Sequence, residues 1–280
     1  MVNGKAQDKR VTVNNTQLRY LDWGTEGKPL LICLHGHTGE AHIWDEFAEA
    51  MSPYFHVLAI DQRGHGDSQW SADGYERDLF VADLAAFMDV LSLGKVTLVG
   101  LSMGGWNSIL YTPNHPERVE RIILVDIAPD IGKGMKENRA PRPPTPLEFD
   151  SLEDAISLAR QNNLWVTDER LRRDIMARIR QRDDGKWVWK ADPKLMGGTL
   201  RDTEPEFVAR SWRSFEAIKC PILEIRGTES PAVSDELLED MTKANSQFSF
   251  VDVEGAGHVV CVDKPQEFIE AARVFLGVAV

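Results

Sequence analysis

One short stretch limits what this chain can fold into more than any other, because it joins a strand to a helix through a turn rich in glycine. Residues 95–99 form an apolar, β-branched run typical of a buried strand, and residues 106–111 have the pattern of a helix. Gly100 and Gly104 each stand two residues from Ser102, and glycine tolerates the strained backbone and close packing of such a sharp turn. We therefore expect the Ser102 hydroxyl at the end of a strand, facing the positive end of the helix dipole.

Strands and helices alternate along most of the rest of the chain. Residues 11–13 and 18–21 alternate like the two strands of a hairpin, with Asn14-Asn15 as the turn. Apolar runs predict further strands at residues 29–34, 56–60, 119–125, 220–227 and 248–253. Segments with apolar residues at helical spacing predict helices at residues 41–51, 78–93, 235–244 and 265–274. This alternation predicts an α/β fold with a mostly parallel central sheet and helices on both faces, whose ligands bind at the carboxyl ends of the strands.

The character of the sequence changes between residues 130 and 218, where the apolar strands stop. Helices are predicted there at residues 152–161 and 168–182. We therefore expect two domains, a core of residues 1–129 and 219–280 and a helical insertion of residues 130–218. The two predicted helices contain seven arginines: Arg160, Arg170, Arg172, Arg173, Arg178, Arg180 and Arg182. Their ordinary interpretation is a charged helix face paired with nearby carboxylates, and the alternative is a clamp for an acidic substrate.

The composition argues against several classes of function. The chain has 280 residues and a net charge of −12, which argues against a nucleic-acid partner or an anionic membrane. Its three cysteines are far apart and form no C-x-x-C pair, so neither a disulfide framework nor a zinc site is expected. The N-terminus is polar, and no run reaches the roughly 18 apolar residues that a membrane span needs. We expect a cytoplasmic protein that acts on a small molecule without a metal or cofactor, and the sequence leaves a homodimer open.

Residues 100–104, Gly-Leu-Ser-Met-Gly, resemble the G-x-S-x-G nucleophile elbow of the α/β-hydrolase family. The resemblance covers most of the core: residues 35–39 are similar to the family's HG loop, and residues 61–68 to its D-x-R-G-x-G-x-S loop. It implies an α/β-hydrolase fold in which the insertion forms a helical cap. By the same resemblance, the backbone N–H groups of His37 and Met103 form an oxyanion hole.

The resemblance also implies the catalytic residues. Ser102 is the nucleophile, and His258, in a Gly-x-Gly-His loop after the last strand, is the base. The acid departs from the usual family pattern, because Ser230 stands where most members have an aspartate, and Glu229 beside it is out of register. Some members take the acid from the end of the strand that follows the elbow helix, where Asp126 stands. We predict Asp126 as the acid, with Glu229 as the alternative and Ser230 as a hydrogen-bonding aid.

These residues predict a serine hydrolase that cleaves a carboxylic ester or a lactone through an acyl-enzyme. One alternative is a cofactor-free dioxygenase of a heteroaromatic ring, because such enzymes share the fold and use a His–Asp dyad. Hydrolysis of a C–C bond is a second alternative, and a ligand receptor that keeps the fold is a third, which the complete set of Ser, His and Asp disfavours. Trp106, Trp165 and Ser230 are the candidates for the substrate pocket.

Overall fold

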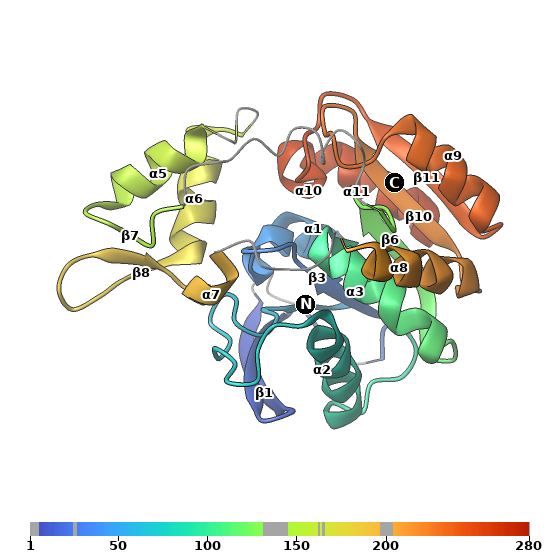
Figure 1. Cartoon of the computed structure of the whole chain (residues 1–280), viewed down its shortest axis with the longest axis horizontal. Coiled ribbons are helices and arrows are strands. Elements are labelled where there is room, and N and C mark those ends of the chain that lie inside the picture. Colours follow the sequence, from blue (N-terminus) through green and yellow to red (C-terminus); the bar gives the residue numbers. More distant parts are fainter. Residues whose placement is uncertain are drawn as a thin grey trace.

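The centre of the structure is an eight-stranded sheet that is parallel except at one edge (Figure 1). The computed structural model describes residues 6–24, 27–130, 145–161, 163, 166–196 and 204–279. In sheet order, the strands are β1 (Gln7–Val13), β2 (Thr16–Asp22), β4 (His56–Ile60), β3 (Leu30–Leu34), β5 (Val96–Leu101), β6 (Val119–Val125), β10 (Ile222–Gly227) and β11 (Phe248–Val253). Strand β2 is antiparallel to β1 and to β4, while the other neighbours are parallel. The predicted mostly parallel sheet is confirmed.

The hairpin at the edge of the sheet turns at the two asparagines, as predicted. Val13 pairs with Thr16, and Asn14 and Asn15 between them have φ angles of 45° and 58°. A two-residue type I′ turn needs two consecutive residues with positive φ, and asparagine tolerates that conformation better than most side chains.

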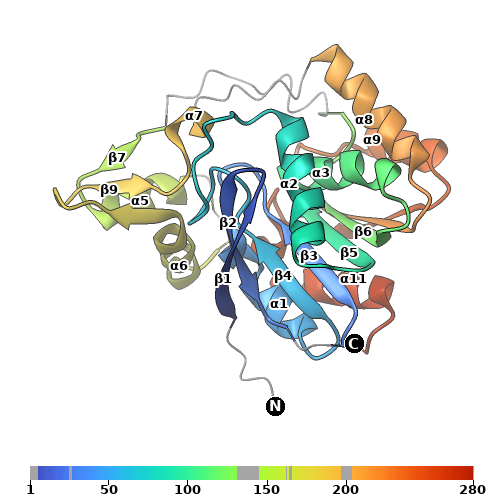
Figure 2. The same ribbon diagram turned by 90° about the horizontal axis from the view of Figure 1, so that it is seen from below.

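Both faces of the sheet are covered, because the side chains of each central strand alternate between them. In β3, Leu31 and Cys33 pack in one cluster with Phe268, whereas Ile32 and Leu34 belong to a second cluster. The first cluster includes α1 (Asp45–Met51) and α11 (Pro265–Leu276), and the second includes α2 (Arg77–Val90), α3 (Met103–Tyr111), α8 (Pro205–Ala217) and α9 (Asp235–Ala244) (Figure 2). In the part of the chain that is described, no helix has the length and apolarity to cross a membrane.

The inserted segment forms a lobe beside the sheet, defined here as the described residues between 145 and 196 (Figure 1, left). It contains α5 (Leu152–Arg160), α6 (Asp168–Arg178), α7 (Pro193–Met196) and a small sheet of β7 (Glu148–Phe149), β9 (Trp187–Trp189) and β8 (Ile179–Gln181). The second predicted helix therefore ends at Arg178 and not at residue 182. Gly185, with a φ of 86°, lies in the turn of a hairpin whose strands are rich in aromatic and β-branched residues, which favour strand pairing. The lobe is therefore mixed and not purely helical.

Helix α8 follows the lobe in the sequence but packs on the core. Its Phe207 meets Trp106 of α3 edge to face, with 5.5 Å between ring centroids. Phe215, further along α8, is fully buried in the second core cluster. This helix therefore extends the helical layer over the sheet.

Polar contacts join the lobe to the core at two sides. The Tyr75 hydroxyl, in the loop after β4, donates to Asp192 Oδ2 at 2.6 Å. On the other side, Arg170 of α6 lies 2.5 Å from Glu46 of α1. These contacts hold the lobe against the loops at the carboxyl ends of the strands, where the candidate residues lie.

Candidate active site

Ser102 occupies the sharp turn that the glycine pattern predicts. It lies between β5 and α3, and its φ of 49° is positive, which strains a residue that has a side chain. A Cβ at Gly100 would come within 2.5 Å of the backbone of Gly104, and one at Gly104 within 2.2 Å of the Leu34 carbonyl oxygen. Both positions therefore require glycine, and α3 starts at Met103, directly after the serine.

The end of β6 brings a carboxylate to the histidine loop. Asp126 Oδ2 accepts hydrogen bonds from His258 Nδ1 at 2.6 Å and from the Ser230 hydroxyl at 2.5 Å. Its other oxygen, Oδ1, accepts from the Gly227 N–H at 3.3 Å. Asp126 is fully buried, whereas 38% of the His258 side chain is exposed. Because an ionised carboxylate can only accept, this bond holds the proton on Nδ1 and leaves the Nε2 lone pair able to take another.

Glu229, the alternative acid, does not contact this histidine in the described structure. Its side chain is exposed, and the hydrogen bond that it makes runs from its backbone N–H to the Ala256 carbonyl oxygen at 2.9 Å. Ser230, a pocket candidate, contacts Asp126 and does not line the cavity described below. The structure thus brings Asp126, Ser230 and His258 together and leaves Glu229 apart.

Ser102 and His258 line one cavity of about 290 Å³ between the core and the lobe. Its apolar wall consists of Ile43, Leu101, Leu171, Ile175, Val259 and Val262. Glu40 enters from the core, and Asp174 and Arg178 enter from the lobe. A largely apolar cavity with a few polar groups is typical of small-molecule sites. In the described residues, no three His, Cys, Asp or Glu side chains are grouped as metal ligands would be.

Of the two tryptophans predicted to line the pocket, only Trp106 is described, and it does not line the cavity. Trp106 is buried between α3 and α8, where its indole N–H donates to the Ala128 carbonyl oxygen at 2.8 Å. An indole that fills the gap between two helices and places its donor on a backbone carbonyl is a packing group. Trp165 lies outside the described residues.

The loop after β3 passes directly beside the serine. A Cβ at Gly36 would lie 3.4 Å from Ser102 Cβ. His35, which precedes it, is fully buried: its Nδ1 donates to the Gly36 carbonyl oxygen at 2.7 Å, and its Nε2 accepts from the Gln62 N–H at 3.0 Å. Burial lowers the pKa of His35 to about 4, so the ring is neutral and each nitrogen keeps one role. His35 therefore orients the loop.

The two residues predicted to form the oxyanion hole flank Ser102. Met103 is the first residue of α3, and His37 follows Gly36 and lines the cavity. The His37 ring also reaches the lobe, with Nε2 at 2.8 Å from the Leu195 carbonyl oxygen. Met103 is therefore the chain neighbour of the serine, and His37 lines the same cavity as the serine.

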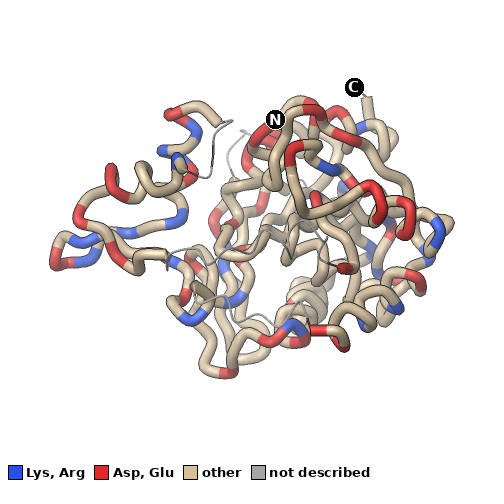
Figure 3. The backbone as a smooth tube through the Cα atoms, turned by 45° about the horizontal axis from the view of Figure 1, so that its top comes forward, with Lys and Arg blue, Asp and Glu red and all other residues tan. Residues whose placement is uncertain are grey.

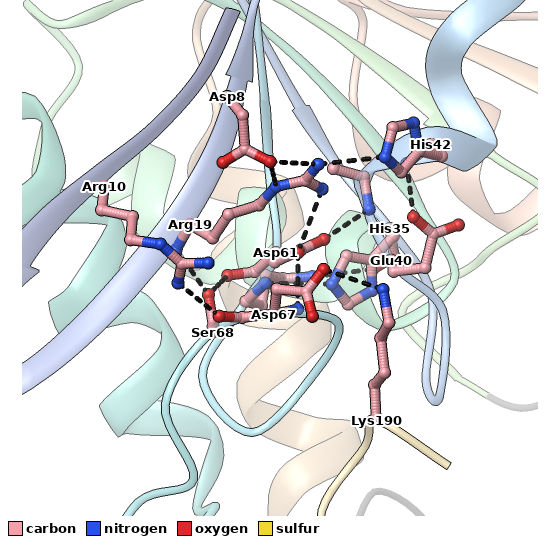
Figure 4. A network of polar contacts seen from close by, with 12 residues as sticks. Asp8, Arg10, Arg19, His35, Glu40, His42, Asp61, Asp67, Ser68 and Lys190 are labelled. Carbon is pink, nitrogen blue, oxygen red and sulfur yellow. Dashed lines mark hydrogen bonds and ion pairs between the residues drawn. The ribbon is translucent and has the colours of Figure 1, made fainter. Parts of the chain in front are cut away.

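A polar network lies next to the HG loop of residues 35–39 (Figure 4). Asp61, at the end of β4, accepts hydrogen bonds from the backbone N–H groups of Ala41 at 2.6 Å and Asp67 at 2.9 Å. Its Oδ2 also lies 3.3 Å from Arg19 Nη1, and its carbonyl oxygen accepts from the Ser68 hydroxyl at 2.5 Å. These bonds join β2, the loop after β4 and the 3₁₀ helix η1 (Ala41–Trp44). They hold η1, which follows the HG loop closely in the chain, against the loop after β4.

A family model described as alpha/beta hydrolase fold matches residues 29–265. This chain belongs to the α/β-hydrolase family. The predicted fold is confirmed, and the chain is a hydrolase of this fold.

Individual relatives of this α/β hydrolase are esterases and other hydrolases. The chain is 31% identical over 261 residues to an esterase of Mycobacterium tuberculosis, covering 90% of this chain and 84% of that protein. It is 28% identical over 274 residues to the 3-hydroxybutyrate-oligomer hydrolase of Cupriavidus necator, covering 93% of each. The crystal structure of E-2-(acetamidomethylene)succinate hydrolase matches with a TM-score of 0.84 at 23% identity, over 98% of this chain and all of that one, which shows the shared fold.

Glu224 is a buried carboxyl beside the acid of this α/β hydrolase, and sequence reasoning missed it. It lies in β10, pairs with Leu124 of β6 and is fully buried. Its Oε1 accepts from the Ile127 N–H at 3.1 Å. Burial and the neighbouring Asp126 raise the pKa of Glu224 well above its ordinary value, because both disfavour the charged form. The available signal was a glutamate inside an otherwise apolar strand, since such a residue is almost never fully buried without a partner.

We expect Glu224→Gln to reduce the loss of stability with rising pH. Because the pKa of Glu224 is higher in the folded state than the ordinary value of 4.5, stability falls as the pH rises above 4.5 towards the folded-state pKa. Glutamine keeps an acceptor for the Ile127 N–H and does not titrate. Urea unfolding at pH 5 and pH 7 measures the free energy of unfolding at each pH. Between these two pH values, we expect that free energy to fall in wild type by up to about 1.4 kcal/mol per pH unit more than in the variant. Equal losses would mean that Glu224 titrates alike in the folded and unfolded protein.

Proposed function

We propose that this hydrolase cleaves a carboxylic ester or a lactone with Ser102 as nucleophile, His258 as base and Asp126 as acid. The observation that carries the proposal is the 2.6 Å hydrogen bond from His258 Nδ1 to the buried Asp126, in a chain whose elbow serine shares a cavity with that histidine. Serine is a weak nucleophile and needs an adjacent base. A histidine held in this tautomer has its Nε2 lone pair available for the serine proton.

The reaction proceeds in two halves. Ser102 Oγ attacks the ester carbonyl carbon while its proton passes to His258 Nε2, and the N–H groups of His37 and Met103 hold the oxyanion. The tetrahedral intermediate collapses, the C–O bond to the leaving alkoxide breaks, and His258 returns the proton to it. Water then gives a proton to His258 Nε2 and attacks the acyl carbon. When the bond from that carbon to Ser102 Oγ breaks, His258 passes the proton to Oγ, which releases the carboxylic acid and restores the Ser102 hydroxyl.

The lobe acts as the cap in this proposal. It contributes Leu171, Ile175 and Arg178 to the cavity wall. These side chains therefore contact the bound substrate, and they discriminate between esters that differ in that part. The names of two relatives, an esterase and an oligomer hydrolase, favour hydrolysis over ring oxygenation. No step of the proposed reaction calls for a metal or an organic cofactor.

A fluorophosphonate probe tests the nucleophile directly. We expect it to add once to the wild-type protein, on the peptide that contains Ser102, because the phosphorus centre mimics the attacked carbonyl. His258→Gln should slow the labelling by about a hundredfold or more, because the serine loses its base. Ser246→Ala, at an exposed serine, is the matched control and should label at the wild-type rate. Intact-mass and peptide mass spectrometry give the readout, and a label on another residue would contradict the proposal.

A further inference from the structure

The seven arginines of the two lobe helices and the strand after them differ in what they contact. In Figure 3 the lobe carries basic and acidic positions close together. Five of the arginines form ion pairs: Arg160 with Asp168, Arg170 with Glu46 and Asp174, Arg172 with Glu153, Arg173 with Glu46, and Arg182 with Glu148 and Asp184. Arg180 lies over the Trp70 ring, 5.8 Å from its centroid. Arg178 is the member that lines the cavity beside Ser102, and among the described residues no carboxylate oxygen lies within ion-pair distance of it.

The Arg178 guanidinium, at the C-terminal end of α6, is held by two hydrogen bonds and by contact with an aromatic ring. Its Nε donates to the Thr38 carbonyl oxygen at 3.2 Å, and its Nη2 donates to the Thr38 hydroxyl at 3.3 Å. The group also lies over the Trp189 ring, 5.3 Å from the centroid. Thr38 follows His37 directly, so the arginine is positioned relative to the loop beside the serine. Among the described residues, its Nη1 donors make no hydrogen bond, so they can serve a ligand in the cavity.

Burial lowers the pKa of Arg178, and the charges of Glu40 and Asp174 in the same cavity wall oppose that shift, although neither forms an ion pair with it among the described residues. Asp174 pairs with Arg170, whose Nε lies 2.8 Å from Asp174 Oδ1. Burial and the nearby Asp61 raise the pKa of Glu40 to about 7, so a large fraction of Glu40 is protonated at neutral pH. Arg178 is half-buried and has no carboxylate in ion-pair contact among the described residues, so an anionic ligand group in the cavity would form a charge-assisted hydrogen bond with it.

We propose that Arg178 binds a carboxylate of the substrate, so that the substrate is an ester with a free carboxylate on its acyl or alcohol side. This inference rests on the proposed ester hydrolysis. A planar guanidinium matches a carboxylate through two parallel hydrogen bonds. Because Asp174 and the ionised fraction of Glu40 lie in the same wall, a singly charged carboxylate is less disfavoured there than a doubly charged phosphate. Bound in this way, the far end of the substrate holds the ester carbonyl near Ser102.

Matched pairs of aryl esters test the inference on the wild-type protein. The p-nitrophenyl monoesters of adipic, pimelic and suberic acid carry a free carboxylate, and their methyl-capped counterparts do not. We expect kcat/KM to be about tenfold or more higher for the free acid in at least one pair, because a hydrogen bond to a charged group contributes about 1.5–3 kcal/mol. The difference should lie mainly in KM, since the carboxylate is bound in the ground state and in the transition state alike.

Variants then assign the preference to one residue. Arg178→Met keeps an unbranched apolar stem without the charge, and should bring the ratio of free to capped ester down to about one. Arg178→Lys should keep part of the preference for the free acid, because the lysine ammonium still carries a positive charge, although it cannot make two parallel hydrogen bonds. Arg172→Met, at an exposed arginine of the same helix, is the matched control and should keep the wild-type ratio. Monomethyl adipate should inhibit Arg178→Met about tenfold more weakly than wild type, and melting temperatures check that each variant folds.

The outcomes separate this inference from the function on which it rests. Equal kcat/KM for free and capped esters in wild type would overturn the role of Arg178 while ester hydrolysis stands. An equal loss for both esters in Arg178→Met would do the same, because an arginine that only supports the lobe gives that result. No hydrolysis of any ester by wild type would overturn both proposals.

Discussion

Replacing Ser102 with alanine should lower kcat for a short p-nitrophenyl ester by about 10⁴-fold or more, with little change in KM. The substitution removes only the Oγ atom that attacks the carbonyl, while the cavity walls and the backbone donors of His37 and Met103 stay in place. A residual rate above that of water is expected, because those donors still stabilise the oxyanion. Steady-state release of p-nitrophenol measures the effect.

The control for this variant is its stability. Alanine retains the Cβ and the positive φ of 49° at this position, so the melting temperature should stay close to that of wild type. A variant that folds and still hydrolyses the ester at a similar rate would contradict the role of Ser102. If wild type hydrolyses no ester and takes up oxygen with a hydroxyquinolone, the dioxygenase alternative replaces the hydrolase.

Asp126→Asn should lower kcat by about 10³- to 10⁴-fold, the second largest effect that we expect. Asparagine has nearly the same size and fills the same buried position, but it offers His258 Nδ1 either an N–H donor or an uncharged oxygen. Where the amide N–H faces the ring, the proton moves to Nε2, and the histidine can no longer accept the serine proton. The imidazolium that forms during attack also loses the negative charge 2.6 Å away.

Glu229→Gln is the matched control for the acid. Its side chain is exposed and makes no contact with His258 in the described structure, so kcat should stay within about twofold of wild type. A large loss in Glu229→Gln together with an active Asp126→Asn would make Glu229 the acid and leave the serine chemistry intact. Measuring kcat of both variants across pH 6 to 9 distinguishes a variant that has lost its base from one whose base only has a shifted pKa.

The features that local patterns predicted are those set by neighbours in the chain. The turn at Asn14-Asn15, the continuous apolar run of β3 and the two glycines around Ser102 each follow from the geometry of a few consecutive residues. Helix α6 shows the limit of such patterns. Charged residues continue past Arg178, yet the pairing of Ile179 with Trp189 turns that segment into a strand. Pairing partners lie outside any local window.

Several features of the candidate site depend on contacts that no local pattern contains. Asp126 and Glu229 both stand near the ends of strands, and only the order β6-β10-β11 decides which of them meets His258, a residue 132 positions from Asp126 in the chain. The same holds for Glu224, whose contact with the Ile127 N–H joins two segments far apart in the sequence, and for Trp106, which packs on α8.

The sequence by itself determined the α/β architecture, the strained turn under Ser102 and the loop that carries His258. Periodicity and glycine spacing act over a few residues, and those distances suffice for a strand, a turn or a helix. The tertiary structure alone decided which carboxylate reaches the histidine and which of the seven lobe arginines faces the cavity. Those choices depend on how distant strands and helices pack, because a side chain acquires a partner only when the fold brings the two together.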